Sequence, residues 1–137
     1  ETTLSSDDDI KTAAREWSEN GVDVVYDPVG GALAEPALRA LRDRGRYAVI
    51  GFASGSIPSL PLNQVLLRNR SIVGVDWGAW SGTHRREQRR LLEELLSMVA
   101  KGDLDPVSSR TEPLASAAQV IDDLLNRRVV GKVALVP

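Results

Sequence analysis

The sequence predicts an α/β fold built on a parallel sheet. Segments with helical spacing alternate with short runs rich in β-branched residues along the whole chain, which is the order produced by right-handed crossover connections. The runs are apolar almost throughout rather than alternating with polar residues. That pattern is typical of strands covered on both faces.

Each element of the first half has its own local signal. Ser6 serves as the N-cap of the first helix, with Asp9 at the third position of a capping box and Trp17 near the end of its apolar stripe. Pro36 is tolerated because it falls in the first turn of the second helix. The predicted elements are a helix over 10–17, a strand over 22–26, a helix over 35–44, a strand over 47–52 and a short helix over 62–67.

The second half continues the alternation. Leu92, Leu95, Leu96 and Val99 form one apolar stripe, and Gly102 ends that helix. The predicted elements are a strand over 71–77, a helix from about 84 to 102, a strand over 106–110, a helix over 114–125 and a closing strand over 131–136.

Composition excludes several classes of function. The 137 residues include no cysteine, which excludes a disulfide, a cysteine-ligated zinc and a thiol nucleophile among them. A net charge of -2 gives no reason to expect nucleic acid or an anionic membrane as a partner. Glu87, Glu93 and Glu94 accompany the arginines between 85 and 90, and no aromatic residue lies among them, so the arginines indicate a solvated helix face. No apolar stretch is long enough to span a bilayer, and the segment ETTLSSDDD has neither the basic region nor the apolar run of a signal peptide. We therefore expect a cytoplasmic protein.

Glycines at the predicted strand ends are the main functional signal. Gly30-Gly31, Gly51 and Gly78 each follow one of the first three strands, and ligands of parallel α/β sheets bind at the carboxyl ends of the strands. A plain turn explains any one of these glycines. Glycines at three strand ends along one edge of the sheet favour a ligand site about as strongly as they favour plain turns.

Four motifs together resemble the quinone oxidoreductase-like branch of the medium-chain dehydrogenase/reductase superfamily. They are VDVVYDPVGG, ALRALRDRGRYAVIGFASG, SIVGVDWGAW and the closing GKVALVP, and the resemblance extends from about residue 10 to the C-terminus. It implies that the chain is the second half of a Rossmann-type sheet with a C-terminal helix–strand extension. No G-x-G-x-x-G pyrophosphate loop occurs, so we expect residues 1–137 to be a C-terminal fragment that lacks the substrate domain.

The resemblance implies a set of cofactor-binding residues and no catalytic side chain. Relatives transfer hydride from NADPH to a quinone or enone, and there the cofactor carries the chemistry. Phe52 is also explained by core packing, and Trp77, with Trp80, by packing at a strand end. The implied residues are Val29, Gly30, Gly31, Ile50, Gly51, Phe52, Ala53, Val75, Asp76, Trp77 and Arg127.

Three polar residues have simpler explanations than a role in binding. A cation at a helix C-terminus accounts for Arg127 without any cofactor. Asp27 is better explained as a cap of the turn after the first strand than as a ribose ligand. His84 is the only histidine and marks a solvated helix start. The resemblance to the quinone branch, rather than composition, implies that no zinc is bound.

Partners and alternatives follow from the same resemblance. The strand over Ser71–Trp77 carries no blunting lysine or proline, and relatives commonly dimerise through it, so we expect a homodimer. The leading hypothesis is part of an NADPH-dependent quinone or enone reductase that is inactive alone. The alternatives are part of an acyl-thioester enoyl reductase and a non-catalytic dimerisation or binding module, which would not bind nucleotide.

Overall fold

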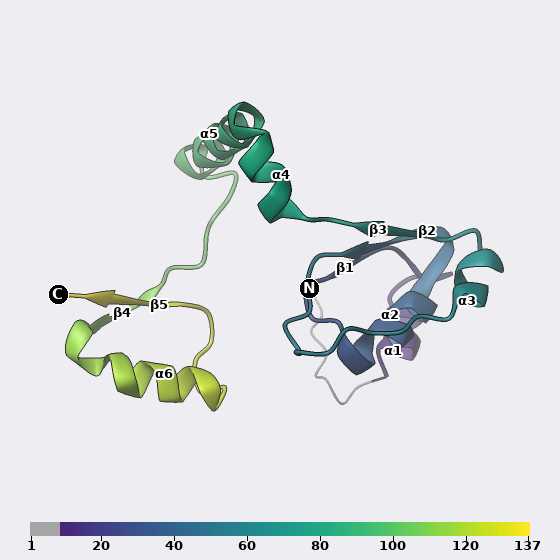
Figure 1. The fold of residues 1–137 in the computed structure, drawn as a ribbon, viewed down its shortest axis with the longest axis horizontal. Coiled ribbons are helices and arrows are strands. Elements are labelled where there is room, and N and C mark those ends of the chain that lie inside the picture. Colours follow the sequence, from purple (N-terminus) through teal and green to yellow (C-terminus); the bar gives the residue numbers. More distant parts are fainter. Residues whose placement is uncertain (1–8) are drawn as a thin grey trace. The chain divides into compact units, whose positions relative to one another are not determined.

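The computed structural model describes residues 9–137, which form two compact units. The first unit ends at Thr83 and the second begins at His84. Each unit is α/β and contains a parallel sheet with helices beside it (Figure 1). The predicted fold class is therefore confirmed.

The first unit is built on a three-stranded parallel sheet in the order β1-β2-β3. β1 (Val22–Asp27) pairs with β2 (Leu41–Val49), and β2 pairs with β3 (Ser71–Gly74). The η1 turn (Gly31–Leu33) and α2 (Ala34–Ala40) connect β1 to β2, and α3 (Leu62–Leu66) lies between β2 and β3. Because the strands are parallel, their carboxyl ends lie at one edge, as predicted.

The first helix starts differently from the prediction. α1 (Ile10–Glu16) has Asp9 as its N-cap, and Asp9 Oδ1 accepts hydrogen bonds from the amides of Lys11 at 3.1 Å and Thr12 at 3.2 Å. The predicted cap, Ser6, lies outside the described residues. Asp9 was expected inside the first turn, but its carboxylate satisfies the free amides there itself.

The second helix is shorter than predicted, and β2 is displaced toward the N-terminus. α2 ends at Ala40 instead of Arg44, because Leu41 is already extended with ψ 139°. β2 accordingly begins at Leu41 and ends at Val49 rather than Phe52. The buried guanidinium of Arg70 donates to the carbonyls of Leu41 and Arg39, which holds the chain where helix becomes strand.

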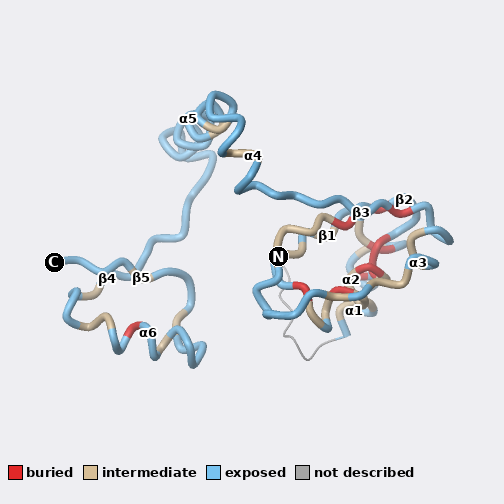
Figure 2. Tube along the Cα trace, viewed as in Figure 1, coloured by how far each residue is buried: buried red, intermediate tan, exposed pale blue. Residues whose placement is uncertain are grey.

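The core of the first unit lies on one face of the sheet. Ala34, Leu38, Leu41 and Tyr47 form a buried cluster, and the buried residues of this unit concentrate on α2 and β2 (Figure 2). On β1, Val24 is 57% exposed and Tyr26 is 70% exposed. The prediction that both faces of β1 are covered is therefore wrong for the first unit. Within residues 9–83, cover is provided only for the face on which α2 packs.

The second unit pairs the last two strands. It comprises α5 (Arg85–Lys101), β4 (Arg110–Pro113), η2 (Leu114–Ser116), α6 (Ala117–Leu125) and β5 (Val133–Val136), with β4 and β5 parallel. β4 begins where the predicted 106–110 strand was expected to end, because pairing with β5 involves Arg110 to Pro113. No helix within residues 9–137 is long and apolar enough to cross a membrane.

Candidate functional site

Asp27 organises the turn at the carboxyl end of β1. Its Oδ1 accepts hydrogen bonds from the amides of Val29 at 2.9 Å and Gly30 at 2.8 Å. The Tyr47 hydroxyl donates to its other carboxylate oxygen. Pro28 keeps Asp27 extended, so the side chain can reach back over the turn. The capping role predicted for Asp27 is confirmed.

The pKa shifts of Asp27 and Tyr47 favour a charged carboxylate beside a neutral hydroxyl. Burial raises the pKa of Asp27, but hydrogen bonds from Tyr47, Gly30 and Val29 outweigh it, so the pKa lies below its ordinary value. Burial, followed by the hydrogen bond and the negative charge of Asp27, raises the pKa of the Tyr47 hydroxyl. At neutral pH the carboxylate is therefore an acceptor and the hydroxyl a donor.

Gly30 and Gly31 need to be glycines because of the chain's own loop. Both have a positive φ, 66° and 65°, which side chains rarely adopt. A Cβ at Gly30 would lie 2.9 Å from the Phe52 ring, and one at Gly31 would lie 2.7 Å from Ser54 Oγ. The close approach predicted at these glycines is thus made at least in part by the segment after β2.

Backbone hydrogen bonds tie this turn to the loop that follows β2. The amides of Ile50 and Gly51 donate to the Asp27 carbonyl at 2.9 and 3.3 Å, and the Ala53 amide donates to the Pro28 carbonyl at 3.0 Å. Val29 and Gly31 take part in two further bonds to this loop, each 3.0 Å long. The two turns therefore behave as one structural block, which places Ile50 to Ala53 beside Val29 to Gly31.

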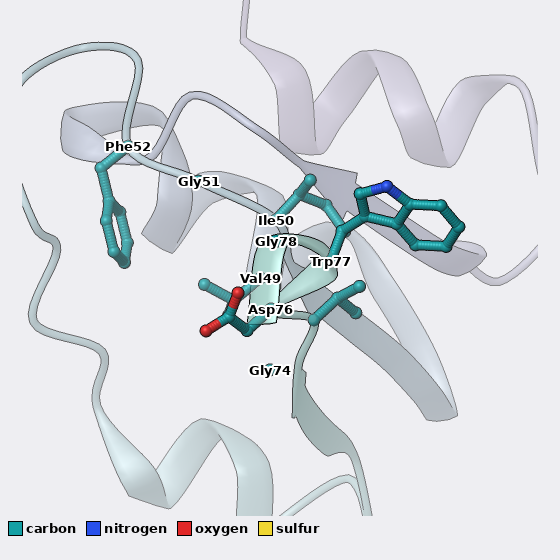
Figure 3. Close-up of a pocket in the computed structure, with 9 residues that line it drawn as sticks. Val49, Ile50, Gly51, Phe52, Gly74, Asp76, Trp77 and Gly78 are labelled. Carbon is teal, nitrogen blue, oxygen red and sulfur yellow. The ribbon is translucent and has the colours of Figure 1, made fainter. Parts of the chain in front are cut away.

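A pocket lies at the carboxyl ends of β2 and β3. Its volume is about 650 Å³, within the range of about 300–1,000 Å³ that is common for ligand sites. In Figure 3, Phe52 and Trp77 lie on opposite sides of the view, with the Asp76 carboxylate between them. The lining residues are Val49, Ile50, Gly51, Phe52, Gly74, Val75, Asp76, Trp77 and Gly78.

The third strand end differs from the prediction. β3 stops at Gly74, and Trp77 begins α4 (Trp77–Thr83) instead of ending the strand. The Asp76 Oδ1 atom accepts from the Ala79 amide at 2.9 Å, so this side chain caps the first turn of α4. Gly78 accordingly lies in the helix, although it still lines the pocket.

Sequence reasoning missed Val49, Gly74 and Tyr47. Val49 and Gly74 line the pocket, and Tyr47 anchors Asp27 from inside the core. A glycine in the middle of an apolar strand was an available signal for Gly74, because it often marks a close approach of backbone or ligand. Nothing in the sequence distinguishes Tyr47 from an ordinary core aromatic.

Arg127 belongs to the second unit and is described there by itself. It follows the α6 C-cap residue Asn126, has φ 55° and donates its amide to the Leu124 carbonyl at 3.1 Å. A residue in the left-handed conformation at this position is a common way for a helix to end. This geometry agrees with the helix-end explanation of Arg127.

Metal ligands do not cluster in the part of the chain that the structure describes. No group of three or more His, Cys, Asp or Glu side chains is arranged there to hold a metal ion. The predicted absence of zinc stays a prediction.

Comparison with known proteins shows the family. A family model described as zinc-binding dehydrogenase matches residues 3–135. The chain belongs to the zinc-binding dehydrogenase family. Its relatives and its fold place it in the quinone oxidoreductase-like branch of the medium-chain dehydrogenase/reductase superfamily, where it corresponds to the C-terminal, cofactor-binding part.

Three members of the family illustrate the similarity. Quinone oxidoreductase-like protein 2 of Bos taurus is 36% identical over 115 residues, which are 84% of this chain and 33% of that protein. A quinone oxidoreductase of Pseudomonas syringae pv. tomato DC3000 superposes with a TM-score of 0.79 at 25% identity, over 96% of this chain and 41% of that one. Escherichia coli quinone oxidoreductase complexed with NADPH gives 0.76 at 26% identity over the same shares.

The chain therefore spans about a third of the curated relative, as its 33% share shows.

The residues that line the pocket suit the nicotinamide end of a dinucleotide. Backbone of Gly51, Gly74 and Gly78 lines the pocket, so no Cβ narrows it at these positions. Apolar side chains make up most of the remaining wall, which suits a flat ring.

Proposed function

We propose that this chain forms the nicotinamide-binding part of an NADPH-dependent oxidoreductase that reduces a quinone or enone. The observation that carries the proposal is the pocket shared by the ends of β2 and β3, next to the turn that Asp27 caps. It coincides with the edge where parallel α/β sheets bind ligands. Family membership and the NADPH complex of a structural neighbour support the choice of cofactor.

Each segment has a defined task in the proposed site. A bound reduced nicotinamide would supply a hydride to the acceptor. The backbone of Ile50, Gly51 and Ala53 would lie beside the ring, and because their amides already donate to the Asp27 and Pro28 carbonyls, carbonyl groups of this segment would hold the carboxamide. Phe52 would wall the ring. Val75 to Trp77 would form the opposite wall. The carbonyls of Asp27 and Pro28 hold the first wall in place, and Val29 and Gly31 bond to the loop just after it.

Several properties of the whole protein remain part of the proposal. We expect the residues that grip the phosphates and the acceptor domain to be contributed from outside these 137 residues, since no glycine-rich phosphate loop occurs among them. We accordingly expect negligible turnover from this chain alone. Arg127 as a cofactor contact, a zinc-free centre and a cytoplasmic location are further expectations.

An NMR titration of this chain with NADPH tests the proposal. We expect saturable changes in the amide resonances of Gly51, Gly74 and Val75. Gly51→Val should weaken binding at least about tenfold, because its Cβ would lie 3.3 Å from the Pro28 carbonyl oxygen and its methyl groups would enter the pocket.

Gly82→Ala is the matched control. Its Cβ would meet nothing within 4 Å, and Gly82 does not line the pocket. Absence of saturable shifts, or equal affinity of the Gly51→Val and Gly82→Ala variants, would contradict the proposal. Absence of shifts that persists in a longer chain with the upstream residues restored would instead favour a dimerisation or binding module.

A further inference from the structure

A second hollow adjoins the proposed nicotinamide pocket. Its volume is about 400 Å³, and it is lined by Gly74, Val75, Asp76, Trp77 and Trp80. The first four of these residues also line the pocket described above. Trp80 is the one lining residue that belongs to the second hollow alone. The segment Gly74 to Trp77 therefore lines both hollows.

Tryptophan dominates this second space. The Trp77 and Trp80 ring centroids lie 5.0 Å apart with an angle of 30° between the ring planes, within the spacing of interacting aromatic pairs. Trp77 is still 46% exposed, and Phe52 across the first pocket is 40% exposed. The only Phe of the chain and two of its three Trp residues thus surround one region. Exposed aromatic surface of this kind is available to a flat ligand.

The charge around the hollow restricts the ligand further. Asp76 is the only charged residue between positions 9 and 137 that lines either space, and its carboxylate accepts a hydrogen bond from the Ala79 amide. No Lys or Arg lines them among the residues that the structure describes. An acyl thioester on a phosphorylated carrier combines a flexible chain with anionic groups, and neither property matches this wall. A neutral conjugated ring matches both its shape and its charge.

We propose that Trp80, together with Trp77, determines acceptor specificity by stacking on a flat, ring-conjugated acceptor in preference to an acyl thioester. The inference rests on the proposed function, since it places the acceptor next to the proposed nicotinamide pocket. Trp80 supplies one wall of the acceptor space, and Trp77, which lines both hollows, borders the acceptor and the cofactor while leaving them in direct contact. Hydride donated from the cofactor side, with a proton from water, would reduce the ring carbonyl system to its hydroquinone level and leave oxidised nicotinamide.

Calorimetric titration of this chain with 1,4-naphthoquinone tests the assignment without requiring turnover. The absence of cysteine removes the thiol chemistry that quinones otherwise undergo with proteins. We expect saturable binding that Trp80→Leu weakens about tenfold, the scale of one lost aromatic contact. Trp17→Leu is the matched control, because Trp17 is 49% exposed and lines neither space. Crotonyl-coenzyme A is expected to bind more weakly and to be insensitive to Trp80→Leu.

Equal quinone affinity in the Trp80→Leu and Trp17→Leu variants would overturn the assignment, as would tighter binding of crotonyl-coenzyme A. NADPH-induced shifts at Gly51 and Val75 are recorded on the same samples. If those shifts persist and quinone binding is absent, the acceptor assignment alone is wrong. If the NADPH shifts are also absent, the proposed function is wrong and the assignment falls with it.

Discussion

Asp27 and Tyr47 connect the core of the first unit to its candidate site. The Tyr47 ring is fully buried, at 0% exposure, yet its hydroxyl reaches the carboxylate that caps the Val29–Gly30 turn. Because the same turn is hydrogen-bonded to the segment after β2, the position of Phe52 depends on this pair. Tyr47 is therefore a positioning residue for a site that it does not line.

Replacing Tyr47 by Phe should destabilise the protein in a pH-dependent way. The variant loses a hydrogen bond to a charged acceptor, so we expect the free energy of unfolding at pH 7 to fall by about 2 kcal/mol. Asp27 has a lowered pKa in the folded state. Its contribution is therefore present at neutral pH and is lost as the pH falls below about 4. Urea unfolding of both proteins at pH 7 and pH 3 measures the difference.

Tyr26→Phe is the control for that comparison, because Tyr26 is 70% exposed on the neighbouring strand. It should leave stability nearly unchanged at both pH values. A Tyr47→Phe effect that is equal at pH 7 and pH 3 would show that the hydroxyl does not act through the Asp27 carboxylate.

The junction of α2 and β2 depends on Arg70, which lies just before β3. Arg70 is 6% exposed, and its guanidinium donates to the carbonyls of Arg39, Leu41, Arg42 and Gln64. Burial, then the charges of Arg68, Arg15 and Arg39, lower the pKa of Arg70. Carbonyl oxygens at a helix C-terminus attract a cation. The Arg70 guanidinium therefore connects the end of α2 and the start of β2 to the residue that precedes β3.

Arg70→Met should therefore destabilise the first unit. One buried and three partly buried carbonyl groups lose a charged donor, and we expect a loss of about 2–3 kcal/mol in the free energy of unfolding. Arg68→Met is the matched control, since Arg68 is an exposed arginine two residues away. Chemical denaturation followed by circular dichroism distinguishes them, and equal losses would refute the role of Arg70.

The proposed assembly concerns β3, which is an edge strand of its sheet within the described residues. We propose that two copies pair along β3. The interface is shorter than predicted, because the strand covers Ser71–Gly74 and excludes Trp77. The Val75 amide donates to the Val49 carbonyl at 3.0 Å. Because backbone amides point to alternate sides along a strand, the amide of Val73 also points toward β2, whereas the amide of Ile72 points away from it.

Ile72→Pro should consequently prevent dimerisation. It removes an outward amide and places a proline on the free edge, while the bonds between β3 and β2 remain. Ile72→Val retains the amide and serves as the control. Multi-angle light scattering should report a monomer for the first variant and a dimer for the second; a dimer in both would exclude pairing through β3.

Much of the first unit's architecture was determined by the sequence alone. Alternating helical and β-branched segments predict a parallel sheet, and parallel strands bring their carboxyl ends, with Gly51 and Gly78, to the same edge. The pairing of the Ile50–Phe52 and Val75–Trp77 segments in one pocket could be predicted for the same reason. Local turn chemistry likewise predicted the capping role of Asp27.

Only the tertiary structure decided where helix gives way to strand and what fills the space around the glycines. α2 stops at Ala40 because Arg70, a residue distant in sequence, holds the carbonyls of Leu41 and Arg42 just beyond it. Gly30 and Gly31 are required because the loop carrying Phe52 and Ser54 packs onto them. These outcomes depend on contacts between segments far apart in the chain, whereas periodicity and turn propensity depend on neighbours, which a single sequence already contains.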